Sequence, residues 1–366
     1  MKNIISHQED KKWMNHALVH AKKGNGSVSP NPLVGAVITK NGEKIGEGFH
    51  EYYGGPHAEV NAIQNAEKNG HPVSDATLFV TLEPCSHSGK TPPCTNLIRE
   101  KKIARVVFAA SDPNPLARGG AGILQKAGIE VVSGVLEEKA REQNQFFFHF
   151  WENHRPFFLG KIAISHNGLI ANPLGEKTII SEEKALKYGH TLRARCDAIL
   201  VGINTALSDD PKLTVRHSIL GKNPLRILLD TSGKCAENAQ ILHDSHFLIF
   251  SSEYGKEKLL KKNISPENII VFPTKIIPPK DIAQSLFQRG ISSVLVEGGA
   301  ATLRTFFEAK LLDEFHLMKS KKVLSANGVS FAISLQQYGF SMTQKTPLGN
   351  SDVLEIWKPK TERHSS

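Results

Sequence analysis

Strand-like apolar runs alternate with helix-like segments along most of this chain, and this alternation is the strongest constraint on its fold. Short apolar runs predict four strands in the first half, namely Leu33–Thr39, Thr77–Leu82, Arg105–Ala110 and Glu130–Val135. Residues with helical spacing precede the first strand, at 13–21, and lie between later strands, at Ala58–Glu67 and Thr95–Lys102. Because parallel strands need a crossover connection, the alternation predicts an α/β layer with a largely parallel sheet.

The alternation stops at an aromatic-rich stretch, Phe146–Trp151, and then starts again. The second series of predicted strands comprises Phe157–Ser165, Ala198–Ile203, Leu225–Asp230, His246–Ser251, Asn268–Phe272 and Val294–Val296. A chain of 366 residues is also too long for one ordinary hydrophobic core. We therefore predict two α/β domains, residues 1–148 and 156–360, with the aromatic stretch as a helix between the two cores.

Composition narrows the class of protein. Hydrophobic residues make up 40% of the chain and charged residues 22%, as in globular proteins. No apolar run approaches the roughly 20 residues that cross a bilayer, and the first ten residues contain no signal-like apolar segment. We expect a cytoplasmic protein. The net charge of +9 is scattered along the chain, so it suits phosphorylated small molecules at least as well as nucleic acid.

One histidine, one glutamate and two cysteines indicate a metal site. His57-Ala58-Glu59 opens a predicted helix, Cys85 follows a proline, and Cys94 follows two prolines. A catalytic zinc ion takes three protein ligands and leaves a fourth position for water, whose pKa it lowers. We predict His57, Cys85 and Cys94 as the zinc ligands. Glu59 is then the carboxylate that moves protons between the water and a leaving amine.

Two other interpretations of these residues stay open. A lone His-x-Glu pair is common in sequences without a catalytic role, and the two cysteines could be ordinary buried thiols. A structural zinc ion would need a fourth cysteine or histidine, and His87 could supply it. The joint occurrence of the four residues, in this order and flanked by glycine and proline, favours the catalytic site.

The spacing of the cysteines points to a particular family of deaminases. Eight residues separate Cys85 from Cys94, whereas the general deaminase signature has two. The segments Pro30–Gly35, Glu83–Cys94 and Asp112–Pro115 resemble those of the riboflavin-pathway deaminases. The resemblance implies a cytidine-deaminase-like fold and a phosphoribosyl pyrimidine substrate. The residues that it implies as substrate contacts are Asn31, His50, His87, Lys90, Asp112 and Asn114.

The second half lacks the usual dinucleotide fingerprint. No Gly-x-Gly-x-x-Gly occurs, so a doubly wound dinucleotide domain is not supported. Glu297-Gly298-Gly299 instead follows a predicted strand and precedes a predicted helix over residues 301–310. Glycines at such a turn let backbone N–H groups approach a phosphate at the start of the helix. Arg193 and Arg216 can bind a substrate phosphate through their paired N–H donors.

Several segments of this half resemble the reductase half of the same bifunctional family; they are Lys161–Ser165, Leu192–Ala194, Asp197–Gly202, Asp209–Arg216 and Val296–Gly299. The resemblance implies a dihydrofolate-reductase-like fold that uses NADPH. The residues that it implies as cofactor contacts are Ala163, Ile179, Thr205, Asp209, Thr231 and Gly299. The residues that it implies as substrate contacts are Lys161, Lys177, Arg193, Leu213, Arg216 and Glu297.

Two positions depart from the family pattern. His166-Asn167-Gly168 stands where the family has Leu-Asp-Gly, and Ile179 stands where the family has tryptophan. An impaired reductase is therefore an alternative to an active one. We expect an active enzyme, because the cofactor carries the chemistry of hydride transfer and the protein mainly positions the reactants.

The two resemblances together predict a bifunctional riboflavin-pathway enzyme that uses Zn²⁺ and NADPH. It would hydrolytically remove the 2-amino group of 2,5-diamino-6-(ribosylamino)-4(3H)-pyrimidinone 5′-phosphate and then reduce the ribosyl group to ribityl. The resemblance also implies a homo-oligomer, a dimer or tetramer, with no nucleic-acid or membrane partner. The rivals are a tRNA deaminase, which predicts the short cysteine spacing, and a zinc-stabilised binding protein without reductase chemistry.

Overall fold

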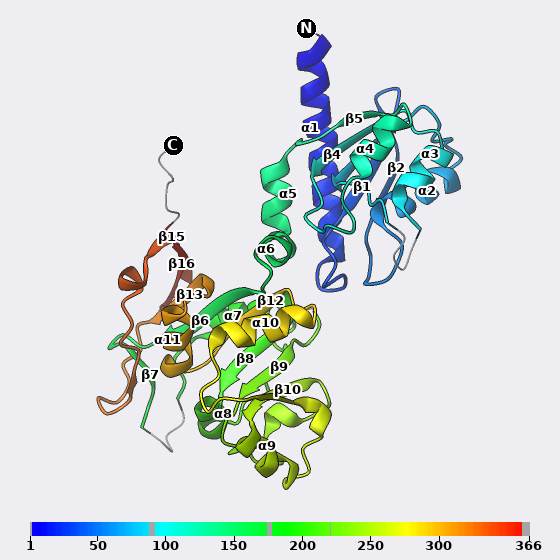
Figure 1. Cartoon of the computed structure of the whole chain (residues 1–366). Helices are drawn as coiled ribbons and strands as arrows, with labels where there is room; N and C mark the ends of the chain where they lie inside the picture. Colours follow the sequence, from blue (N-terminus) through cyan, green and yellow to red (C-terminus); the bar gives the residue numbers. More distant parts are fainter. Residues whose placement is uncertain (1, 88–91, 174–177, 220, 361–366) are drawn as a thin grey trace. The chain divides into compact units, whose positions relative to one another are not determined.

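The computed structural model describes residues 2–87, 92–173, 178–219 and 221–360. The chain divides into two compact units, Met1–Asn153 and His154–Ser366. Each unit is built around its own main sheet (Figure 1). In the described ranges, no helix combines the length and the apolar character needed to cross a membrane.

The first unit contains a five-stranded sheet in the order β2-β1-β3-β4-β5. Its strands are β1 (Gly35–Lys40), β2 (Glu43–Phe49), β3 (Thr77–Leu82), β4 (Arg105–Ala110) and β5 (Glu130–Val132). β3, β4 and β5 are parallel, but β1 is antiparallel to both β2 and β3. The prediction of a largely parallel sheet is thus wrong at this edge. Asn41 and Gly42, with φ of 55° and 80°, form a tight hairpin turn, and the chain returns as the unpredicted strand β2.

Helices cover both faces of this sheet. They are α1 (Lys2–Ala21), α2 (Ala58–Lys68), α3 (Cys94–Glu100), α4 (Gly120–Lys126), α5 (Glu137–Gln143) and α6 (Gln145–Asn153). Successive residues of β1 point to opposite faces, as in any strand: Ile38 packs with Ile63 of α2, and Val37 packs with Met14 of α1. The aromatic stretch forms the predicted helix, α6, whose Phe148 joins the α1 side of the core.

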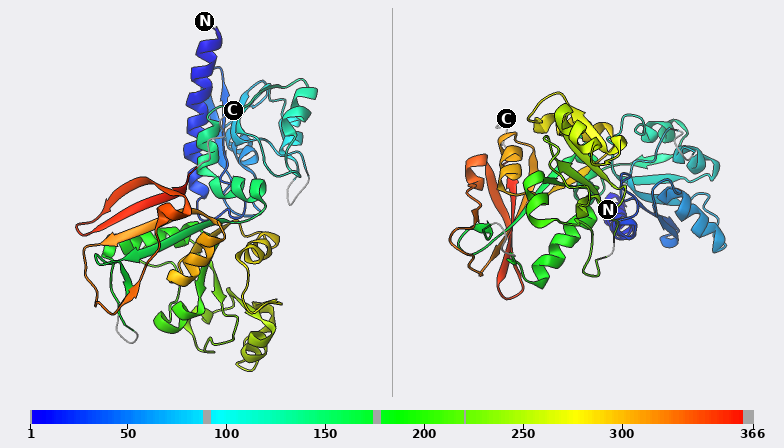
Figure 2. Two further views of the ribbon diagram at one scale, coloured as in Figure 1. Left: turned by 60° about the vertical axis from the view of Figure 1, so that its left-hand side comes forward. Right: turned by 90° about the horizontal axis from the view of Figure 1, so that it is seen from below.

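The second unit contains a nine-stranded sheet in the order β11-β10-β9-β8-β12-β6-β13-β16-β15. Its strands are β6 (Phe157–Ile164), β8 (Ala198–Gly202), β9 (Leu225–Leu229), β10 (Phe247–Ser252), β11 (Ile269–Phe272), β12 (Ser293–Val296), β13 (Leu312–Ser320), β15 (Phe340–Leu348) and β16 (Asp352–Pro359). A separate two-stranded ribbon pairs β7 (Leu169–Ala171) with β14 (Val329–Ser330). The strands from β11 to β13 are parallel, while β16 and β15 are antiparallel additions, in red in Figure 2. The six strands predicted for this half are confirmed, whereas β13, β15 and β16 were not predicted.

The helices of this unit are α7 (Glu183–Arg195), α8 (Ile203–Asp209), α9 (Glu253–Leu260), α10 (Pro279–Gln288) and α11 (Ala300–Glu308). On one face, Leu286 of α10 and Phe306 of α11 pack with Phe158 of β6. On the other face, Ala185 of α7 packs with Met318 of β13. Because the central strands are parallel, their carboxyl ends lie along one edge, which is where open α/β sheets bind ligands.

Candidate functional site

The first unit brings His57, Cys85 and Cys94 together from three elements. His57 is the extended residue immediately before α2, Cys85 follows β3, and Cys94 is the first residue of α3. Their ligand atoms all lie within 4.8 Å of one another. The three predicted ligands, 37 positions apart at most, therefore converge on one point.

The distances among these atoms fit a zinc ion. His57 Nδ1 lies 3.5 Å from Cys85 Sγ and 3.3 Å from Cys94 Sγ. Around a tetrahedral zinc ion, nitrogen and sulfur ligands are separated by about 3.6 Å. Hydrogen bonds with Cys94 and His57 lower the pKa of Cys85 to about 4, whereas the hydrogen bond with Cys85, together with burial, raises the pKa of Cys94. Without a metal the pair therefore carries its first negative charge on Cys85, and a thiolate is the form that binds metal. Among the described residues the cluster has three members, and His87 is not one of them, which does not support the structural-zinc interpretation.

A cavity of about 250 Å³ opens beside these ligands, and Glu59 lines it together with His57 and Cys85. The Glu59 side chain is buried in the first turn of α2, and burial raises its pKa. A carboxyl group with a raised pKa holds a proton more readily, as a group that accepts and returns a proton needs to do. The arrangement thus places a proton carrier beside a site for a metal.

The substrate residues predicted for the deaminase half and described by the structure all line this cavity; they are Asn31, His50, His87, Asp112 and Asn114. Lys90 lies outside the described residues. His87 Nδ1 is buried and has no hydrogen-bond partner among the described residues, so it is available to a ligand.

Hydrogen bonds orient two of these side chains. Asn31 Nδ2 donates to His50 Nε2 at 3.1 Å, and His50 Nδ1 donates to the Pro56 carbonyl at 3.0 Å. Burial lowers the pKa of His50, which keeps the ring neutral and able to accept from Asn31. The pair therefore presents a fixed amide and imidazole at the cavity wall.

Two polar side chains on the next loop also line the cavity. Burial raises the pKa of Asp112 to about 7. Asp112 Oδ1 accepts a hydrogen bond from the Asn114 N–H at 2.8 Å, and Asn114 Oδ1 accepts one from the Leu116 N–H at 3.0 Å. Asn114 thus has the turn-forming role that asparagine often has beside proline, in addition to its place in the cavity wall.

Glu83 also belongs to this site, although its sequence context did not predict a role for it. Its buried carboxylate accepts hydrogen bonds from the N–H groups of Asp112, Gly119 and Ala121, at 3.3, 3.1 and 3.0 Å. Glu83 therefore holds the loop that carries Asp112 and Asn114 against the cavity. Its place before Pro84-Cys85 was the available signal, but a single glutamate in a sequence is usually a solvated residue.

In the second unit, Glu297 binds two cationic side chains. Arg193 donates to it from Nε and Nη2, at 2.9 and 3.0 Å, and Lys161 Nζ donates at 3.0 Å. Burial acts to raise the pKa of Glu297, but Arg193 and Lys161 outweigh burial and hold the pKa below its ordinary value. Three predicted substrate residues therefore form one cluster with an excess positive charge. The donors of Arg193 face Glu297 here, rather than being free for a phosphate as predicted.

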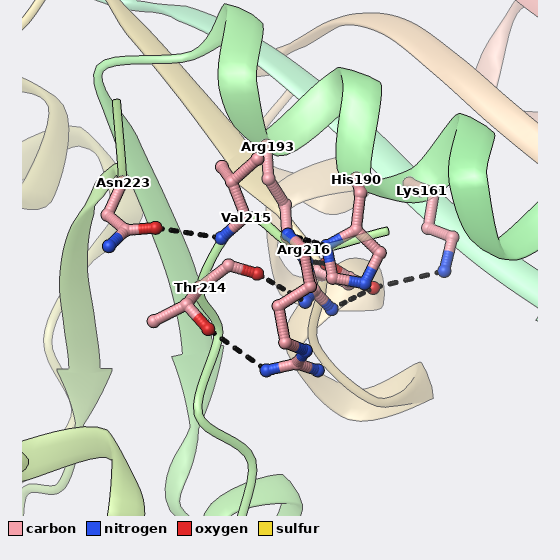
Figure 3. Close-up of polar contacts among 8 residues, drawn as sticks. Lys161, His190, Arg193, Thr214, Val215, Arg216 and Asn223 are labelled. Carbon is pink, nitrogen blue, oxygen red and sulfur yellow. Dashed lines mark hydrogen bonds and ion pairs between the residues drawn. The ribbon is translucent and has the colours of Figure 1, made fainter. Parts of the chain in front are cut away.

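The neighbouring segment carries the other predicted arginine. Arg216 is exposed, its Nη1 donates to Thr214 Oγ1 at 2.9 Å, and its N–H donates to His190 Nδ1 at 3.0 Å. Burial, then Arg193 and Arg216, lower the pKa of His190 to about 4, so the ring is neutral and can accept. Leu213, also predicted to contact substrate, is buried and has φ of 53°, a strained value for leucine. Figure 3 shows His190 and Arg193 extending from α7 toward this segment.

A second cavity, of about 270 Å³, lies at the carboxyl ends of β8 and β9. Three of the predicted cofactor residues line it: Thr205, Thr231 and Gly299. The Gly299 N–H donates to Thr205 Oγ1 at 3.1 Å, and α11 begins at the next residue. A cavity that includes the start of a nine-residue helix suits the phosphates of a dinucleotide.

The other predicted cofactor residues do not line this cavity. Ala163 packs near Ala185 and Met318, Ile179 is 56% exposed, and Asp209 is exposed at the end of α8. Their contacts with cofactor stay predictions. Lys177 lies outside the described residues.

The departure at Asn167 is accommodated structurally. Asn167 Oδ1 accepts hydrogen bonds from Ser165 Oγ and the Leu324 N–H, and its Nδ2 donates to the Leu324 carbonyl. Gly168, with φ of 76°, completes the turn between β6 and β7. The side-chain amide of Asn167 thus stabilises this turn through both its donor and its acceptor group.

Comparison with known protein families agrees with both sites. Residues 7–110 match the cytidine and deoxycytidylate deaminase zinc-binding region, and residues 156–344 match the RibD C-terminal domain. The riboflavin biosynthesis protein RibD of Aquifex aeolicus is 40% identical over 319 residues, which cover 86% of this chain and 88% of that protein. The protein of the same name from Actinobacillus pleuropneumoniae is 34% identical over 360 residues, which cover 97% of this chain and 91% of that protein.

Solved structures match both units at once. A diaminohydroxyphosphoribosylaminopyrimidine deaminase/5-amino-6-(5-phosphoribosylamino)uracil reductase from Thermotoga maritima has a TM-score of 0.85 and 36% identity, covering 97% of this chain and 100% of that one. RibD of Acinetobacter baumannii, in its second crystal form, has a TM-score of 0.87 and 34% identity, with the same coverage. The predicted cytidine-deaminase-like and dihydrofolate-reductase-like folds are confirmed, as are the zinc and NADPH requirements. A tRNA deaminase and a non-enzymatic binding protein are not favoured. The chain belongs to the RibD family of riboflavin biosynthesis proteins, and it is a bifunctional enzyme that joins a zinc-dependent deaminase to an NADPH-dependent reductase.

Proposed function

We propose that this chain removes the 2-amino group from 2,5-diamino-6-(ribosylamino)-4(3H)-pyrimidinone 5′-phosphate and then reduces the ribosyl group of the product to ribityl. The names of the Thermotoga maritima activities describe these two steps in that protein. The observation that carries the proposal here is the convergence of His57, Cys85 and Cys94 beside the buried carboxyl group of Glu59.

In the deaminase half, His57, Cys85 and Cys94 would hold the zinc ion. The ion would supply a water molecule of lowered pKa. Glu59 takes the two protons of the attacking water in turn: one goes to the neighbouring ring nitrogen, and the other goes to the amine nitrogen, which leaves as ammonia while a carbonyl group forms on the ring carbon. The remaining cavity residues orient the substrate; they are Asn31, His50, His87, Asp112 and Asn114, with Lys90 as a phosphate partner.

In the reductase half, Lys161, Arg193 and Glu297 position the sugar for reduction. NADPH supplies the hydride for the anomeric carbon. Arg216 is exposed beside this cluster, and its guanidinium suits the 5′-phosphate. Leu213 and Lys177 complete the proposed substrate contacts. Those proposed for the cofactor are Ala163, Ile179, Thr205, Asp209, Thr231 and Gly299.

We assign the deaminase to residues 1–148 and the reductase to residues 156–360. We also propose that the protein is a cytoplasmic homo-oligomer, a dimer or a tetramer. Light scattering of the purified chain tests the oligomer, and cell fractionation tests the location.

One coupled assay tests both activities, by following ammonia release and NADPH oxidation in the same sample. Glu59→Gln should release no ammonia, retain its zinc by metal analysis, and still oxidise NADPH when the deaminated pyrimidine is supplied. Glu297→Gln should release ammonia like wild type but should not oxidise NADPH when the deaminated pyrimidine is supplied. Ammonia release by Glu59→Gln at the wild-type rate would contradict the deaminase assignment. Unchanged NADPH oxidation by Glu297→Gln would contradict the role given to that carboxylate.

A further inference from the structure

The cavity beside Gly299 carries a single charged side chain. Of the described residues that line it, Lys275 alone has a charged side chain, and the others are apolar, glycine, asparagine or threonine. Lys275 lies on the loop between β11 and α10 and is exposed. Within the part of the chain that the structure describes, no carboxylate pairs with its ammonium group. The cavity therefore holds one unneutralised cation in a largely apolar wall.

The sheet order gives the direction in which a dinucleotide would cross this cavity. Glu297 follows β12, Thr205 follows β8, Thr231 follows β9, and Lys275 follows β11. These parallel strands stand in the order β12, β8, β9, β10 and β11, so their carboxyl ends form a row. Four strand spacings separate the two ends of the row, roughly 19 Å. Lys275 lies at the end farthest from Glu297.

The position of the reaction orients the cofactor along this row. The nicotinamide ring must face the sugar, which the cluster of Lys161, Arg193 and Glu297 receives. Gly299 and the start of α11 come next and suit the diphosphate. The adenosine half then extends toward the loop of Lys275. Ile276, on the same loop, lines the cavity although it is 80% exposed, and such an aliphatic surface suits the face of a purine.

We infer that Lys275 binds the 2′-phosphate of NADPH and makes this chain prefer NADPH to NADH. The two cofactors differ only in that phosphate, which carries close to two negative charges at neutral pH. A lysine at the adenosine end of the cavity therefore discriminates between them, whereas an uncharged wall would not. The inference rests on the proposed reductase function and adds the residue that selects its cofactor.

The test is direct binding of cofactor to the full-length protein, without turnover. NADPH and NADH are titrated by fluorescence, and 2′,5′-ADP and 5′-ADP by calorimetry, into wild type, Lys275→Met and Lys275→Arg. Lys275→Met should weaken NADPH and 2′,5′-ADP by about 10- to 100-fold, the usual effect of one charge-assisted hydrogen bond. It should change NADH and 5′-ADP by less than about twofold, and Lys275→Arg should restore most of the loss. The salt dependence of NADPH binding should also fall in Lys275→Met.

Lys280→Met is the matched control, because Lys280 is exposed at the start of α10 but does not line the cavity. It should leave all four affinities unchanged. Equal weakening of NADPH and NADH by Lys275→Met, or no weakening of either, would overturn the inference and leave the reductase function standing. Wild-type protein that binds neither dinucleotide would overturn both.

Discussion

Arg193 donates two parallel hydrogen bonds to Glu297, from Nε at 2.9 Å and from Nη2 at 3.0 Å, across 104 positions of the sequence. Its third donor group, Nη1, reaches the Thr214 carbonyl at 3.3 Å. This one guanidinium therefore connects helix α7, the turn after β12 and the segment that carries Arg216. The geometry of the reductase site depends on it.

Arg193→Lys should lower the reductase kcat/KM by about 10- to 100-fold, because lysine keeps the charge but cannot form the two parallel bonds. NADPH oxidation with the deaminated pyrimidine measures this, and ammonia release in the same preparation should not change. Arg195→Lys, an exposed position on the same helix, is the control. An unchanged reductase kcat/KM in Arg193→Lys would show that the reductase does not need the two parallel hydrogen bonds to Glu297.

Removal of zinc should abolish the deaminase and spare the reductase. A strong chelator should stop ammonia release, and added Zn²⁺ should restore it, because the ligands His57, Cys85 and Cys94 all lie in the first unit. Cys94→Ser should lower the zinc content of the purified protein, as measured by elemental analysis. Ammonia release that survives complete loss of zinc would contradict the metal assignment.

Gly48→Ala should destabilise the first unit by about 1 to 3 kcal/mol, the usual cost of forcing a methyl group into a packed site. A Cβ at Gly48 would lie 2.3 Å from the backbone nitrogen of Ala62 and 2.7 Å from the Ala58 carbonyl oxygen. Both atoms belong to α2, which carries Glu59, so deaminase activity should fall as well. Thermal unfolding and ammonia release measure the two effects.

The matched control is Gly122→Ala, in α4, where an added Cβ would meet no atom within 4 Å. That change should be neutral or should stabilise the protein by up to about 1 kcal/mol, since alanine favours the helix. Equal loss of stability in both variants would show that the contact with α2 is not the cause.

Acid should weaken the second unit through Glu314. Burial acts to raise the pKa of Glu314, but His316 and Lys358 outweigh it and lower the pKa to about 2, from an ordinary 4.5. His316 Nε2 lies 2.6 Å from Glu314 Oε1, and Tyr188 of α7 reaches His316 Nδ1 at 2.9 Å. Because the folded-state pKa is depressed, the stabilisation is complete above pH 4.5 and is lost as the pH falls toward 2.

The lost stabilisation is on the order of 3 kcal/mol. Glu314→Gln should therefore show a smaller fall in unfolding free energy between pH 5 and pH 2 than wild type, measured by calorimetry at each pH. A mutant whose stability follows the wild-type pH curve would rule out this role for the carboxylate.

Much of the deaminase site could be predicted because the residues expected to carry out its chemistry lie in short sequence motifs. His57 and Glu59 are adjacent to a helix start, and each cysteine follows a proline, so residue type and local structure could be combined without knowledge of the fold. Strand β2 was missed despite the Asn41-Gly42 turn signal. Its glycines at 46 and 48 interrupt the apolar pattern of a strand, and only contact with α2 explains them.

Strand β13 was missed for a related reason. Glu314 and His316 occupy buried positions of that strand, where an apolar alternation would hold hydrophobic residues. They are tolerated because each satisfies the other and because Lys358 and Tyr188 complete the network. None of these hydrogen bonds and ion pairs can be predicted from the hydrophobic pattern of the strand itself.

By itself, the sequence determined the kinds of element, the division into two α/β domains and the chemical character of the metal ligands, since periodicity and motifs are properties of neighbouring residues. The tertiary structure alone decided which distant residues meet. It joined Lys161 to Glu297 across 136 positions, directed Arg193 to a carboxylate and set Lys275 in a cavity wall. Such meetings depend on strand order and on helix packing, and both are set by the burial of whole faces rather than by any one segment of the chain.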